Sequence, residues 1–226
     1  MGRANILRRS ATAQADSRPE RGPTRIFGSL VDRSLLDLTA RILTEVLAPW
    51  VIVIAIPFAV TWQSTHRAVT TVGWGVVVAL TSSVIAMAVI VWGARHGRWD
   101  GHHVRNREDR AVPFVVLIAC TAAGGTALIL AHAPAPVTAL DISMIVSLLV
   151  TGAVTTRWKI SIHAAVAAGA AGAAAITYGP AFVLLAVPAA GVAWSRVRLG
   201  DHTTAQVITG LATGALIGSG LYGLLR

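Results

Sequence analysis

The segment Val72–Trp92 reads VGWGVVVALTSSVIAMAVIVW and contains no Asp, Glu, Lys or Arg. A run of about 20 mostly apolar residues is long enough to cross a hydrocarbon core of about 30 Å as an α-helix. Similar runs recur along the chain and alternate with short clusters of Arg and His. The 226 residues are only 13% charged, whereas soluble domains average about 25%. The sequence therefore predicts an all-α integral membrane protein.

The same pattern, followed outward from Val72–Trp92, predicts a bundle of transmembrane helices. The expected spans are 46–62, 72–92, 112–131, 137–156, 162–176, 181–194 and 203–225. The fifth and sixth are short, so six spans remain an alternative to seven. The single cysteine, Cys120, lies in an apolar run. One chain can therefore form neither a disulfide nor a cysteine metal site.

The N-terminal region differs in composition from the rest of the chain. Residues 1–29 are rich in Arg, Pro, Gly and Ser and lack the apolar core of a signal peptide. We expect a disordered, basic cytoplasmic tail here. Residues 30–45 carry apolar side chains at helical spacing with charges on the other face, which indicates an interfacial amphipathic helix. Residues 46–226 then form the transmembrane domain.

The basic residues predict the orientation. All of the 19 Lys and Arg residues except Arg67 and Arg226 fall on one side of the predicted topology. The positive-inside rule places that side, and the N-terminus, in the cytoplasm, which suits a multi-pass protein of the cell membrane. Six tryptophans lie near predicted span ends, as an aromatic belt requires: Trp50, Trp62, Trp92, Trp99, Trp158 and Trp194. The net charge of +9 is divided among short loops, so we do not expect nucleic acid as a partner.

Three polar clusters gather on the predicted cytoplasmic side. They are residues 98–110, residues 157–163, and residues 195–202 followed by Gln206. An even number of spans separates each pair, so the clusters meet at one membrane face. Arg, Lys, Ser and His together suit an anionic group such as phosphate. Two histidines supply a nucleophile and a proton donor. We see no metal-ligand set and expect no cofactor.

These clusters resemble the three motifs of the type 2 phosphatidic acid phosphatase (PAP2) superfamily. Ser195-Arg196-x5-His202 resembles the third motif, SRxxxxxHxxxD, and Ser161-Ile162-His163 resembles the second, PSGH. The segment that ends at Arg110 lies where the first motif, KxxxxxxRP, is expected. The stretches KISIHAAVAAG and WSRVRLGDHTTAQV are most similar to small multi-span PAP2-like proteins of actinobacteria. The resemblance covers roughly residues 95–224.

The resemblance implies a PAP2-like helical core and a role for each matching residue. It implies that His202 is the nucleophile that forms a phosphohistidine and that His163 protonates the leaving alkoxide. The residues implied to hold the phosphoryl oxygens are Arg196, Ser161 and Arg110, with Arg105, Arg107 or Lys159 in place of the first-motif lysine. The implied substrate is a prenyl or glyceryl lipid phosphate, as monophosphate or diphosphate. Such chemistry depends mainly on positioning and charge stabilisation.

The sequence also departs from the family pattern. Gln206 replaces the aspartate that orients the nucleophilic histidine, and at i+4 on one helix face its carbonyl oxygen accepts the imidazole N–H. Asp201, next to His202, is expected to point elsewhere on that helix. His103 stands at the first-motif lysine, Ala111 replaces the proline of RP, and Ile162 replaces the glycine of PSGH. These changes are compatible with a weak enzyme, an unusual substrate or a lost activity.

Two other functions remain open at this stage. One is a non-catalytic PAP2-like membrane protein that binds an anionic lipid or a partner protein, including another copy of itself. The other is a small transporter that uses Asp141, the only acid within a predicted span. Because Asp141 is near the start of its span, an interfacial position is an equal alternative. A metal-dependent prenyltransferase is disfavoured, because no DxxxD pair lies at a span end.

Overall fold

A computed structural model describes residues 23–97 and 111–226 of the chain, and these residues form helices only. The chain divides into two units, Met1–Leu36 and Asp37–Arg226. In the first unit the described part is helical from Pro23. The helix therefore begins before Leu30, where the sequence pattern predicted its start. The site described below lies entirely within the second unit.

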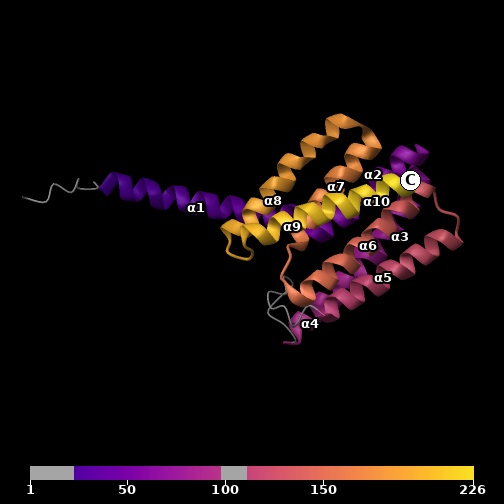
Figure 1. Ribbon diagram of the computed structural model, residues 1–226, viewed down its shortest axis with the longest axis horizontal. Helices are drawn as coiled ribbons and strands as arrows, with labels where there is room; N and C mark the ends of the chain where they lie inside the picture. The colour runs from indigo at the N-terminus through magenta and orange to yellow at the C-terminus, as the bar shows by residue number, and fades with distance from the viewer. Residues whose placement is uncertain (1–22, 98–110) are drawn as a thin grey trace, which may run out of the picture. The chain divides into compact units, whose positions relative to one another are not determined.

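Within each of the two described ranges the helices follow one another with short connections (Figure 1). In chain order they are α1 (Pro23–Val46), α2 (Pro49–Thr65), α3 (Ala68–Ala79), η1 (Leu80–Val84), α4 (Ile85–Arg95), α5 (Ala111–Leu130), α6 (Ala135–Arg157), α7 (Ile162–Tyr178), η3 (Pro180–Leu185), α8 (Ala186–Arg198), α9 (Thr204–Thr213), η4 (Gly214–Ser219) and α10 (Gly220–Leu225). The elements η1 and η4 are π-helical turns inside longer helices, and η3 is a 3₁₀ turn that leads into α8. Each predicted span from the second onward thus corresponds to one helical stretch.

Several of these stretches are long enough to cross a membrane. Among the described residues, four qualify by length and apolar character: Ala68–Arg95, Ala135–Arg157, Pro180–Arg198 and Thr204–Leu225. Ser34–Val46 with Pro49–Thr65 adds a fifth if the pair, bent by 48°, is one broken span. Helices α5 and α7 have apolar segments that are shorter. The described residues are therefore all-helical and include helices able to span a membrane, as predicted, while the count of six or seven spans stays a prediction.

The tightest packing joins α7 to η4 through small residues. A β-carbon added to Gly214 would overlap the backbone carbonyl of Ala165, and one added to Gly210 would lie 2.5 Å from the Ser161 carbonyl oxygen. Glycine at these positions lets two backbones approach closely, which is a common way to pack helices in membranes. This contact fixes the first turn of α7 beside α9.

Gly214→Ala is expected to destabilise the protein by about 1–3 kcal/mol, because the added methyl group must push α7 away from η4. The measurement is thermal unfolding of the detergent-solubilised protein. Gly73→Ala is the matched control, since a β-carbon at Gly73 has nothing within 4 Å. Equal melting temperatures for Gly214→Ala and the unsubstituted protein would contradict the packing described here.

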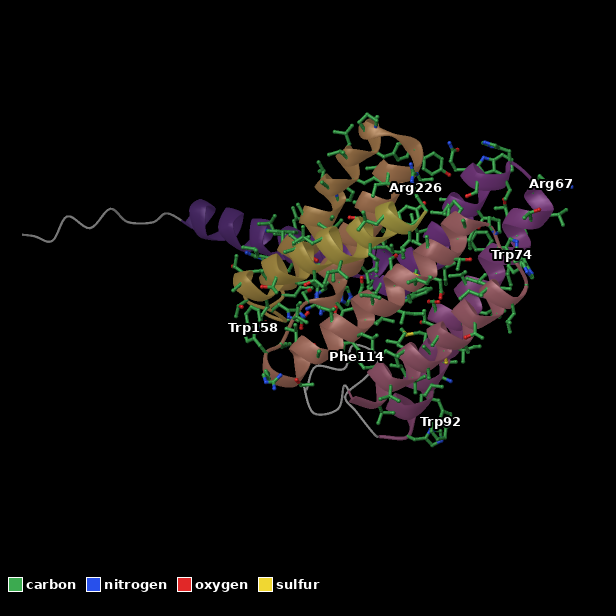
Figure 2. The ribbon with its side chains drawn as sticks, turned by 45° about the vertical axis from the view of Figure 1, so that its right-hand side comes forward. Arg67, Trp74, Trp92, Phe114, Trp158 and Arg226 are labelled. Carbon is green, nitrogen blue, oxygen red and sulfur yellow. The ribbon has the colours of Figure 1, made fainter. Side chains whose placement is uncertain are left out.

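Hydrogen bonds show which helix ends meet. At one end the Ser161 N–H donates to the Gln206 carbonyl oxygen at 3.3 Å, which joins the start of α7 to α9. At the other end the Tyr178 hydroxyl donates to the Ala59 carbonyl oxygen, and Arg226 donates to the Ile176 carbonyl oxygen. Figure 2 shows Arg67 and Arg226 toward one end of the bundle and Trp92, Phe114 and Trp158 toward the other. Five of the predicted belt tryptophans are exposed, as lipid-facing side chains would be: Trp50, Trp62, Trp92, Trp158 and Trp194.

Candidate functional site

Three predicted site residues line one cavity of about 250 Å³ in the second unit. Arg196 comes from the last turn of α8, His163 from the first turn of α7, and His202 from the turn between α8 and α9. All three side chains are buried, with 5%, 9% and 8% of their surface exposed. The structure therefore brings together the arginine and both histidines that the sequence motifs singled out.

The turn after α8 fixes how Arg196 and His202 face each other. The backbone N–H groups of Asp201 and His202 both donate to the Arg196 carbonyl oxygen at 3.1 Å. This tight return needs a left-handed residue, and Gly200 supplies it with φ +73°. Glycine adopts that conformation without the steric cost of a β-carbon. The five residues between Arg196 and His202 in the third motif thus form the end of α8 and the turn that follows it.

Gln206 holds His202 in one tautomer. The amide oxygen of Gln206 lies 3.2 Å from His202 Nδ1, and it also accepts the backbone N–H of Thr203 at 3.1 Å. The Thr203 hydroxyl in turn accepts a hydrogen bond from the backbone N–H of Gln206, which completes a capping box at the start of α9. Because the Thr203 N–H can only donate, the group facing His202 is the oxygen, and Nδ1 must carry the proton. The predicted orienting contact of Gln206 is present, and in the neutral imidazole it leaves the lone pair on Nε2.

Asp201 is placed differently from the expectation. The residue lies in the turn before α9 and not on that helix, and His202 also precedes the helix, which begins at Thr204. The Asp201 carboxylate pairs with the Arg196 guanidinium at 3.1 Å. Its carbonyl oxygen accepts a 2.6 Å hydrogen bond from Lys159 Nζ. The expectation that Asp201 lies on the helix is therefore wrong, because the turn at Gly200 directs its carboxylate onto Arg196.

The remaining predicted phosphate ligands divide into two groups. Ser161 is fully buried as the N-cap of α7, where its hydroxyl accepts the Ala164 N–H at 3.4 Å, and it is not among the residues that line the cavity. Lys159 contacts Asp201 as described and does not line the cavity either. Three further arginines lie outside the described residues, so their predicted roles stay predictions: Arg105, Arg107 and Arg110.

Away from the charged end, the cavity is a mainly apolar channel between helices. Its walls come from α2, α4, α5, α6 and α7, with side chains such as Ile56, Met87 and Leu117. Along α6 the lining runs from Thr151 to Leu140, which spans about 16 Å at a rise of 1.5 Å per residue. The inner end therefore lies deep in the bundle, and Arg196 and the histidines lie at helix termini.

The sequence interpretation missed a row of hydroxyl groups on α6. Ser143, Ser147 and Thr151 recur at every fourth residue and all line the cavity. We call these three residues the hydroxyl row. The spacing S-x3-S-x3-T within an apolar span was the available signal, because residues four apart share one helix face. The α6 wall of the cavity thus carries hydroxyl side chains at three levels between its apolar residues.

Asp141 lies beside the inner end of this cavity. Its side chain is fully buried, and its Oδ1 accepts a 3.3 Å hydrogen bond from Ser82 of η1, which lines the cavity. The residue is therefore inside the helix bundle. Its depth in the membrane, within the span or at the interface, stays a prediction.

Metal ligands are sparse in the described part of the chain. No group of three or more His, Cys, Asp or Glu side chains there is close enough to share a metal ion. The polar end of the cavity instead offers one guanidinium, two imidazoles and the N-terminal end of α7. Helix N-termini and guanidinium groups are typical binding sites for phosphate.

Comparison of the chain with protein-family models, curated proteins and solved structures gave no match. The likeness to the PAP2 superfamily therefore rests on the motif residues quoted above.

Proposed function

We propose that this protein is a membrane phosphatase that hydrolyses a lipid phosphate at the cytoplasmic face of the cell membrane. The observation that supports this most is a single cavity with Arg196, His163 and His202 at one end and a long, mainly apolar interior. A lipid phosphate is divided in the same way as the cavity: its doubly charged head matches the end with Arg196, and its hydrocarbon chain matches the apolar interior. The seven-span or six-span PAP2-like core and the cytoplasmic orientation are part of this proposal.

The first chemical step in this proposal uses the geometry around His202. The lone pair of Nε2 attacks phosphorus while the bond from phosphorus to the lipid oxygen breaks. His163 gives its proton to the leaving alkoxide, which departs as the free alcohol. Arg196 holds the phosphoryl oxygens as charge develops on them. Asp201 orients the guanidinium for this task through their ion pair.

The second step returns the enzyme to its starting state. Water attacks the phosphohistidine, and His163, now neutral, accepts a proton from that water. The bond from Nε2 to phosphorus breaks, and inorganic phosphate leaves. Gln206 keeps Nδ1 protonated throughout. As a neutral amide it stabilises a positively charged imidazole less than a carboxylate would, so we expect slow turnover.

A second candidate function is binding of an anionic lipid without hydrolysis. Gln206 in place of a carboxylate favours it, and so does the direct pairing of Asp201 with the Arg196 guanidinium. In that case the cavity holds a lipid phosphate or an anionic headgroup and releases it unchanged.

The test of the proposal is phosphate release by purified protein in detergent, with a metal chelator present. The panel contains prenyl and glyceryl lipid monophosphates and diphosphates. Rapid quenching also measures phosphate bound covalently to the protein, and phosphohistidine is recognised because it survives alkali and is lost in acid. Release together with such an adduct supports hydrolysis through His202. Saturable lipid binding with no release and no adduct would favour the second candidate instead.

A further inference from the structure

We infer that Thr44, near the end of α1, is a positioning residue for the proposed reaction and acts through Ser195 on Arg196. This inference rests on the proposed function in taking Arg196 as the residue that holds the phosphoryl group. It extends the site to a helix that lies outside the part of the chain that resembles the PAP2 motifs. Thr44 and its contacts belong to the second unit.

The hydroxyl of Thr44 is used differently from several other helix hydroxyls in this protein. Four Thr side chains donate to the carbonyl oxygen four residues earlier in their own helix: Thr61, Thr121, Thr155 and Thr213. This is a common arrangement for a hydroxyl group inside a helix. Within the hydroxyl row, Ser143 likewise donates to the Leu140 carbonyl oxygen at 2.7 Å. The Thr44 hydroxyl instead lies 3.0 Å from Ser195 Oγ, on α8.

The direction of this hydrogen bond follows from the other contact of Ser195. Ser195 Oγ donates to the Val192 carbonyl oxygen at 2.7 Å. A hydroxyl group has one proton to donate, so Ser195 accepts from Thr44. Both side chains are buried, with 3% of the surface of Thr44 and none of that of Ser195 exposed. A buried hydrogen bond is stronger than one in water, so Thr44 forms a firm, directional link from α1 to α8.

This link ends one residue before Arg196. An α-helix has 3.6 residues per turn, so the side chains of neighbouring residues point about 100° apart. Ser195 therefore faces α1, while Arg196 lines the cavity. By holding Ser195, Thr44 fixes the rotation of the last turn of α8 about its axis, and with it the direction in which Arg196 points.

The other contacts between these two helices are less suited to this task. Asp37 pairs with Arg198 at 2.7 Å, but 51% and 31% of the two side chains are exposed, and exposed ion pairs contribute little. A β-carbon on Gly191 would lie 3.6 Å from Leu43 Cδ1, so the helices also meet through apolar groups. Apolar burial is not directional, and it leaves the rotation of α8 to the buried hydrogen bond.

A purely structural role for Thr44 makes a different prediction. Thr44→Val keeps the branched shape and removes only the hydroxyl group, whereas Thr44→Ser keeps the hydroxyl group and removes a methyl group. If packing were the whole role, the serine variant would be the more strongly affected of the two. If the hydroxyl group positions Arg196, only the valine variant is affected.

The first measurement is phosphate release by the full-length protein in detergent. Thr44→Val is expected to lower kcat about tenfold or more, because a displacement of about 1 Å can cost about 10²-fold in rate. Thr44→Ser should stay within about twofold of the unsubstituted protein. Thr61→Val is the matched control and should also keep its activity, because Thr61 is fully buried, bonds its own helix and is not a cavity residue.

Ser195→Ala tests the same link from its other side. It removes the acceptor of the Thr44 hydroxyl, so it should lower kcat by a similar factor. Residues that act through one contact are not additive, so Thr44→Val combined with Ser195→Ala should lose no more activity than either change alone. A melting temperature for each variant checks that it is folded.

The second measurement needs no substrate. Arg196 Nε is buried, so its proton is protected from exchange with water and can be followed by NMR in protein labelled with ¹⁵N-arginine. The signal is assigned by its loss in Arg196→Lys. It should shift in Thr44→Val and stay in place in Thr44→Ser and Thr61→Val.

Three results would overturn the inference: an Arg196 signal that Thr44→Val leaves in place, an equal shift in Thr44→Ser, or a shifted signal with unchanged phosphate release. The NMR measurement does not depend on turnover, so its outcome is separate from that of the phosphatase test. If the signal responds only to loss of the Thr44 hydroxyl and the unsubstituted protein releases no phosphate, Thr44 positions Arg196 and hydrolysis is contradicted. Phosphate release with an unmoved signal has the opposite meaning.

Discussion

His202→Ala is expected to lower phosphate release by roughly 10³-fold or more, because it removes the atom that attacks phosphorus. The acid-labile phosphate adduct should disappear at the same time. His202 contributes little to the helix core, since it lies in the turn before α9 with its ring against Gln206 and the cavity. The measurement is the initial rate with the best lipid of the panel, at equal amounts of folded protein.

The control for this substitution is His132→Asn. His132 is exposed in the turn between α5 and α6, at φ +53°, a conformation that asparagine tolerates. Its activity should match that of the unsubstituted protein. If His202→Ala retained a tenth of the activity, the phosphohistidine mechanism would have to be abandoned, although hydrolysis by direct attack of water would remain.

Arg196→Lys is expected to lower phosphate release by about 10²–10³-fold, even though it keeps the positive charge. A guanidinium presents a fork of donors that can bind Asp201 and phosphoryl oxygens together, whereas an ammonium is a single point of charge. Lysine also avoids leaving the partly buried Asp201 carboxylate without its cation at residue 196, so the loss of activity is separated from a loss of folding. The readouts are the initial rate and the melting temperature.

Arg198→Lys is the matched control two residues along the same helix. Arg198 pairs with Asp37 at 2.7 Å and is much more exposed than Arg196. Its activity should stay within about twofold, because exposed ion pairs contribute little. Equal losses in the two variants would show that the charge at the end of α8 matters and the position of Arg196 does not.

The positions of the helices could be predicted closely, because a continuous run of apolar residues is visible within the sequence of each helix. Val72–Trp92 lies within the continuous stretch Ala68–Arg95, and each later run corresponds to one helical stretch, whereas the run 46–62 contains the break between α1 and α2. Breaks between helices coincide with clusters of polar residues, glycine or proline, which are visible in the sequence. The start of α1 at Pro23 was not predicted, because the residues before Leu30 lack the apolar repeat on which the assignment depends.

The site could be predicted in part. Arg196, His163 and His202 share a cavity because alternate loops of a helical membrane protein lie at the same face. The pairing of Asp201 with Arg196 depends on the left-handed turn at Gly200, and spacing alone does not show where such a turn directs the next side chain. Ser161 was predicted to bind phosphate, but it lies directly before α7 and caps that helix. Serine is a common N-cap residue, so its position at a helix start explains the hydroxyl without a ligand.

The pair formed by Ser82 and Asp141 has a consequence for how the chain is made. An aspartate within a spanning segment costs free energy, up to about 3 kcal/mol at the centre of the segment, when that segment enters the lipid alone. Ser82 belongs to the helix that is synthesised two helices earlier, and Gly125 of α5 lies directly against Asp141 Oδ2. When α6 leaves the translocon, a hydrogen-bond donor and a fitted backbone surface have therefore already been inserted. Insertion in chain order thus spares Asp141 a period in which its helix lies alone in the bilayer.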